Sequence, residues 1–186
     1  MSMAKISVRL DNLKALIQDP DFLEGKGLSN EVNIRIFCYD PKEEMTVRHF
    51  VEQLKNEQLN CRAIQYDLYE VFLDILRDKR ILEKVEGLEE KRGKDFIKKQ
   101  FDKSCDAKTF AAKLNYPDHQ KNDVVILSGV GKVFPFMRVH SLLEAMQPLF
   151  TDVPILVLYP GEFDGHYVRL FNKLKKNEYY RAFKSI

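Results

Sequence analysis

Two short, largely apolar runs constrain the fold of this chain more than any other feature. One spans residues 123–128 (DVVILS) and the other residues 153–159 (VPILVLY). Apolar runs of this length, bounded by turn residues, are typical of strands buried on both faces, as in parallel α/β sheets. Each run is followed by a glycine-containing segment, 129–140 after the first and 160–165 after the second. Loops that leave the carboxyl ends of such strands usually hold ligands or partners, so we expect these two loops to lie close together and to form the functional surface.

The rest of the chain alternates helix-like and strand-like patterns. Helices are expected near 6–17, 41–54, 68–76 and 135–147, and further strands at 33–39 and 61–66. Between the second and third strands, residues 79–115 carry dense charges of both signs with few apolar positions, which predicts a helical excursion on the outside of the fold. The chain therefore reads as one α/β domain, residues 1–186, with a mainly parallel sheet of about four strands flanked by helices.

Composition narrows the class of protein. The 186 residues are 45% hydrophobic and 31% charged, which is ordinary for a folded globular chain and argues against disorder. No apolar run approaches the roughly 20 residues needed to cross a bilayer, and the amino terminus lacks the apolar region of a secretory signal. The three cysteines include no CxxC pair. These features predict a cytoplasmic protein with reduced cysteines.

The glycine-rich segment 129–132 (GVGK) follows a predicted strand and invites a nucleotide-binding interpretation. A phosphate-binding P-loop requires the pattern GxxxxGK[ST], but Ile126 stands where the first glycine should be and Val133 where the hydroxyl should be. A dinucleotide fingerprint also fails, because its third glycine would fall at Phe134. Helix amides and the lysine could still hold an anion. The sequence favours a tight strand-to-helix corner over a phosphate site.

Acidic residues gather at predicted strand ends, namely Asp40, Asp67, Glu162 and Asp164. Parallel strands would bring them to one edge, where paired carboxylates could bind a cation or act as acid and base. A structural interpretation is favoured, because Asp40 and Asp67 directly precede predicted helices and can cap them, and the other two lie in a turn. No metal or other cofactor is predicted.

Motifs for nucleophilic or metal-dependent catalysis fail as well. The four histidines show no metal-ligand spacing, and no serine lies in a GxSxG elbow. The sequence therefore offers no positive reason to predict an enzyme.

A basic and aromatic tail is the remaining candidate. Residues 166–186 contain six lysines or arginines against one acid, and 179–183 reads YYRAF. Basic residues interleaved with aromatics can bind a nucleic-acid backbone while stacking bases. Val168, Phe171 and Leu174 recur at helical spacing, however, which predicts that part of this tail faces the core. Core packing and protein contact are favoured over DNA.

Several segments taken together resemble the BrxB family, and the resemblance covers nearly the whole chain. They are 22–31, 39–41, 128–140 (SGVGKVFPFMRVH), 147–148, 153–165 and 179–183. Members of this family are encoded in bacterial BREX (bacteriophage exclusion) operons, which block phage replication and mark host DNA by adenine methylation with a separate methyltransferase. The resemblance implies a small, non-catalytic component that contacts the alkaline-phosphatase-like protein or the large ATPase of such a system.

Three hypotheses follow. The leading one is an adaptor or assembly component of an anti-phage complex. The others are a nucleotide- or phosphate-binding α/β enzyme that uses the 129–132 loop and strand-end carboxylates, and a DNA-binding accessory protein that uses the basic tail. The residues expected to bind a partner or an anion are Gly129, Gly131, Lys132, Phe134, Phe136, Arg138, Glu162, Asp164, Tyr179, Tyr180 and Arg181.

Overall fold

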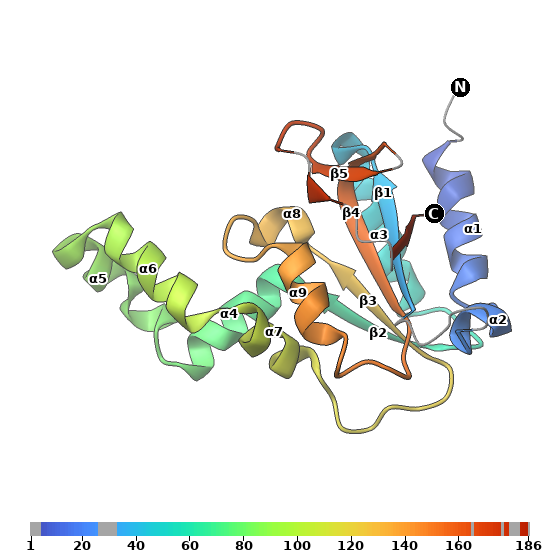
Figure 1. The fold of residues 1–186 in the computed structure, drawn as a ribbon, viewed down its shortest axis with the longest axis horizontal. Coiled ribbons are helices and arrows are strands. Elements are labelled where there is room, and N and C mark those ends of the chain that lie inside the picture. The colour runs from blue at the N-terminus through green and yellow to red at the C-terminus, as the bar shows by residue number, and fades with distance from the viewer. Residues whose placement is uncertain (1–4, 26–32, 165, 176, 179–182, 186) are drawn as a thin grey trace.

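A computed structural model describes residues 5–25, 33–164, 166–175, 177–178 and 183–185 (Figure 1). Its strands are β1 (Ile34–Tyr39), β2 (Arg62–Asp67), β3 (Asp123–Ser128), β4 (Ile155–Phe163), β5 (Tyr167–Leu170), β6 (Asn177–Glu178) and β7 (Phe183–Ser185). Its helices are α1 (Ile6–Leu16), α2 (Pro20–Leu23), α3 (Glu44–Leu54), α4 (Leu68–Asp78), α5 (Val85–Arg92), α6 (Lys94–Ser104), α7 (Ala107–Leu114), α8 (Val130–Val133) and α9 (Val139–Met146), with the short 3₁₀ turns η1 (Pro41–Glu43) and η2 (Leu82–Lys84).

The sheet confirms the predicted α/β class and its mainly parallel strands. The main path runs β2-β3-β4-β1-β7, and every pair along it is parallel. The four expected strands form the part of this path from β2 to β1, and three short strands from the carboxyl-terminal region join them. β5 pairs antiparallel with the end of β4, and β6 pairs antiparallel with β5.

The two apolar runs lie at the centre of the sheet, buried on both faces as predicted. In β3, Val125 and Leu127 belong to one core, whereas Val124 and Ile126 belong to the other. This alternation follows from the pleat, which sends successive side chains to opposite faces. The first core is closed by helices that include α4, α7 and α9, and the second by α1 and α3.

The predicted helical excursion is present between β2 and β3, but its parts differ. Figure 1 shows α5 and α6 projecting away from the sheet, whereas α7 lies beside α9. Phe110 and Leu114 of α7 have no exposed surface, because they pack in the main core. The sequence could not separate the two parts, since all three helices read as amphipathic segments rich in charge.

Three sequence predictions were wrong in detail. The helix expected over 135–147 begins only at Val139, because Pro135 leaves Phe134 extended, with ψ 135°, and interrupts the helical backbone before it. The helical spacing of Val168, Phe171 and Leu174 does not mark a helix, since the chain forms β5 and then a turn. β4 itself continues to Phe163, so most of the expected 160–165 loop is strand.

Within the described parts of the chain, no helix is both long and apolar enough to cross a membrane.

Candidate functional site

The candidate site lies at the carboxyl ends of the central strands, where the two predicted loops meet. A side chain added at Gly131, in the loop after β3, would come within 3.2 Å of Pro160 Cγ in β4. The expected proximity of the two loops is therefore confirmed. We call this junction of Asp67, Gly129–Lys132, Pro160 and Phe171 the carboxyl-edge corner.

Gly129 makes the sharp turn from β3 into α8. Its φ is +73°, a left-handed value that only glycine adopts without strain. The turn is closed by the Val133 amide, which donates to the Gly129 carbonyl at 3.0 Å. A Cβ at this position would overlap the Asp67 carboxylate and lie 3.2 Å from the Leu68 nitrogen. The glycine therefore allows the β3 corner to pack directly on the end of β2.

The Asp67 carboxylate links the end of β2 to the turn that follows β3. One carboxylate oxygen accepts from the Tyr69 amide at 3.0 Å, which confirms the predicted cap of α4. The other oxygen binds the Lys132 ammonium, and the two side chains are 27% and 32% exposed. Lys132 is thus held by a salt bridge at the protein surface. In a P-loop the corresponding lysine binds a phosphate, whereas here a carboxylate of the same chain neutralises it.

Phe171 covers the other side of the same turn. A Cβ at Gly131 would lie 2.6 Å from Phe171 Cε1, so the ring rests directly on the glycine. The Phe171 amide donates to the Pro160 carbonyl at 2.8 Å, which holds the ring in this place. Phe171 and Asn172 both have positive φ, 56° and 58°. Such backbone is uncommon for a bulky residue, and the surrounding packing must maintain it.

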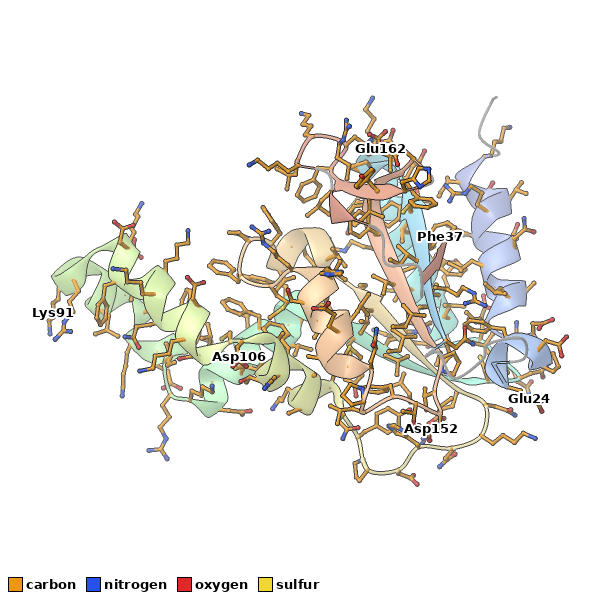
Figure 2. All side chains as sticks on the ribbon, in the orientation of Figure 1. Glu24, Phe37, Lys91, Asp106, Asp152 and Glu162 are labelled. Carbon is orange, nitrogen blue, oxygen red and sulfur yellow. The ribbon has the colours of Figure 1, made fainter. Side chains whose placement is uncertain are left out.

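The β4–β5 hairpin lies beside the carboxyl-edge corner and carries charged residues of both signs. Glu162 pairs with Arg169 across the hairpin, with Oε1 and Nη1 3.2 Å apart. Asp164 accepts from the amides of His166 and Tyr167 at 3.1 and 2.8 Å, so it orders the turn. Figure 2 places the labelled Glu162 at this end of the sheet, away from Asp152 at the other end.

Each carboxylate that the sequence placed at this edge has a partner within the chain. Asp40 accepts from the Lys42 amide at 2.9 Å, as expected for a cap, and the other three make the contacts given above. Among the described residues, no three histidine, cysteine, aspartate or glutamate side chains come together as a metal site. The edge therefore presents fixed charges, rather than a cluster of carboxylates around a cation.

The predicted aromatic residues of the 129–140 segment have different surroundings. Phe136 stacks on Phe72 with ring centroids 4.8 Å apart and meets Phe101 edge-on at 5.5 Å. It therefore joins the loop to α4 and α6. Phe134 is half-buried and Arg138 is exposed directly before α9. Tyr179, Tyr180 and Arg181 lie outside the described residues.

At the amino ends of β2 and β3, the structure reveals a network that the sequence analysis missed. Asp123 accepts from Arg62 Nε at 2.6 Å and Nη2 at 2.7 Å, from the Tyr116 hydroxyl at 2.8 Å, and from the Gln120 amide at 2.9 Å. Burial raises the pKa of Asp123, but these hydrogen bonds outweigh it and the net pKa is lowered. The only sequence signal was that Arg62 and Asp123 lie at the starts of two predicted strands.

Comparison with known proteins identifies a family and two relatives that resemble this chain. A family model described as "BREX protein BrxB" matches residues 64–185. A protein of that description from Bacillus cereus (strain H3081.97) is 41% identical, with 99% of each chain covered. A second, from Escherichia coli O9:H4 (strain HS), is 28% identical over 97% of this chain and 92% of its own length. No solved structure matches.

Proposed function

This chain belongs to the BrxB family and is thus a BREX component, and we propose that within a BREX system it is a non-catalytic adaptor that contacts the alkaline-phosphatase-like protein or the large ATPase. The observation that carries the proposal is the carboxyl-edge corner together with the β4–β5 hairpin beside it, where ion pairs within the chain hold two surface cations in place. Lys132 is fixed by Asp67, Arg169 by Glu162, and the exposed Arg138 lies in the same loop as Lys132. Charges held in this way favour specific partner recognition, because little side-chain freedom is lost on binding.

The same geometry weighs against the enzyme hypothesis. A general base or a metal ligand must be available to substrate, whereas the strand-end carboxylates are engaged in caps, ion pairs and turns. α8 has only four residues, and the Phe171 ring covers Gly131. The 129–132 segment is thus built as a packed corner, which supports a role in binding a protein rather than in cradling phosphate.

The test is recovery of partners from cells that express the complete operon. The tagged chain is expected to recover the phosphatase-like protein or the ATPase, and the double variant Lys132→Glu with Arg138→Glu is expected to lose most of that recovery. Lys55→Glu is the matched control, because Lys55 is also an exposed lysine in an ion pair, with Glu52 of α3. Wild-type chain that folds but recovers no BREX protein would overturn the proposal.

A melting-temperature screen separates the alternatives. A ligand that binds only the folded state raises the melting temperature, so a shift with a nucleotide and a divalent metal would favour the enzyme hypothesis. DNA binding by the basic tail would instead show an affinity that falls steeply with salt concentration. For an adaptor we expect neither response.

A further inference from the structure

β2 is an open edge of the sheet. All six of its residues pair with β3, in a continuous register from Arg62 opposite Asp123 to Asp67 opposite Ser128. On its other side, β2 has no neighbouring strand among the described residues, since it ends the path β2-β3-β4-β1-β7. Figure 1 shows it on the far side of β3 from β4.

The backbone groups on the outer side of β2 follow from this register. The Arg62 amide donates to the Asn122 carbonyl at 3.0 Å, so Arg62, Ile64 and Tyr66 direct their backbone groups toward β3. The alternate residues, Ala63 and Gln65, direct theirs outward. An outward row of amides and carbonyls is a template for another strand.

β2 lacks two of the features by which proteins protect a sheet edge. It contains no proline, and its pairing with β3 has no bulge. Its interior, residues 63–66 (AIQY), is uncharged. The charged residues at its ends are already neutralised within the chain, Arg62 by Asp123 and Asp67 by Lys132. The interior residues remain only partly buried, whereas the corresponding residues of β3 are fully buried.

We propose that the outer edge of β2 pairs antiparallel with β2 of a second copy of this chain, about a twofold axis at Gln65, which joins two sheets into one. The outward backbone groups of the two Gln65 residues then bond to each other. In this register Ile64 lies opposite Tyr66 of the second copy, an aromatic and β-branched pair of the kind that stabilises sheets. Ala63 lies opposite Asp67, so no like charges face each other.

The same symmetry explains why the occupant is a second copy. A twofold pairing uses the open edge of both chains, so the assembly closes at two and leaves neither copy of β2 exposed. The inference does not rest on the proposed adaptor function, because β2 pairs through its backbone edge, and Asp67 is the one residue that this pairing shares with the carboxyl-edge corner.

The first experiment measures the mass of the full chain in solution by light scattering over a range of concentrations. We expect twice the mass of one chain. Gln65→Pro removes an outward amide that β3 does not use, so it should halve the mass while the chain stays folded by circular dichroism. Gln65→Thr keeps the amide and should remain dimeric.

A cross-linking experiment tests the register without relying on a proline. In a Cys61→Ser background, Gln65→Cys should form a disulfide-linked dimer on mild oxidation, because residues paired by hydrogen bonds across antiparallel strands have Cα atoms about 5.5 Å apart. Ala63→Cys should not, since the two copies of residue 63 would be about 14 Å apart. A wild-type chain that is monomeric at every concentration, or equal cross-linking at both positions, would overturn the proposal.

Discussion

Two aspartate–cation pairs hold β2 to its neighbours, one at each end of the sheet, and their carboxylates differ in burial, whereas both cations are partly exposed. At the amino ends, the Asp123 side chain has no exposed surface and accepts four hydrogen bonds, two of them from Arg62. At the carboxyl ends, Asp67 and Lys132 are each about a third exposed. An aspartate–cation pair can therefore have different roles in this chain, depending on how far its carboxylate is exposed to water.

Burial explains the difference. A buried carboxylate that loses its partners leaves unpaired groups in a region without water, which is costly. An exposed pair contributes little to stability, because water solvates both ions when they separate. We call the hydrogen bonds of Asp123 with Arg62, Tyr116 and Gln120 the amino-edge network, and we infer that it stabilises the fold. The Asp67–Lys132 pair at the carboxyl ends instead positions a surface charge.

The largest effect is expected for Asp123→Ala. Removing this carboxylate leaves the Tyr116 hydroxyl and the Gln120 amide without their acceptor, whereas the Arg62 guanidinium is 40% exposed and keeps its hydrogen bond to the Asp118 carbonyl. The free energy of unfolding should therefore fall by about 2–4 kcal/mol. Urea denaturation measures it. Asp118→Ala is the control, since Asp118 is 77% exposed and 3.8 Å from the same guanidinium, and it should cost at most about 1 kcal/mol. Equal losses in the two variants would contradict the distinction.

Next in size is Gly131→Ala at the carboxyl-edge corner. The added methyl group would meet the Phe171 ring, so we expect a loss of about 1–3 kcal/mol, together with weaker recovery of BREX partners. Gly87→Ala is its control, because a Cβ at Gly87, in helix α5, meets nothing within 4 Å. That substitution should stabilise the chain by about 0.5–1 kcal/mol. A stabilised Gly131→Ala variant would argue against a packed corner.

A smaller effect is expected on the acid dependence of stability. The pKa of Asp123 is lowered in the folded state, so its stabilising contribution is fully present above the ordinary carboxyl value of 3.8 and is lost as the pH falls through the folded value. The stability difference between wild type and Asp123→Ala should therefore narrow on acidification. Urea titrations at neutral and acidic pH measure this, and a constant difference would disprove it.

The smallest effect on stability is expected for Lys132→Ala. Its exposed salt bridge with Asp67 should contribute at most about 1 kcal/mol, so the melting curve should hardly change. Partner recovery should nevertheless fall. A large loss of stability would show that this pair resembles the amino-edge network after all.

Local patterns in the sequence were enough to predict most of the fold. The apolar runs at 123–128 and 153–159 predicted two strands buried on both faces, and Asp40 and Asp67 were expected as caps, because these features depend on neighbouring residues alone. The β5 strand was missed, because Val168, Phe171 and Leu174 are spaced three residues apart, as on one face of a helix. Its strand conformation comes from pairing with the extended end of β4.

For the corner after β3, the sequence by itself determined a tight turn that fails the phosphate-binding patterns, and it also determined the family. Only the tertiary structure decided what surrounds that turn. Asp67 reaches Lys132 across 65 positions of sequence, and Phe171 rests on Gly131 through a positive φ that no local propensity favours. Such contacts depend on strand order and on the packing of distant segments, which the periodicity of a single chain does not encode.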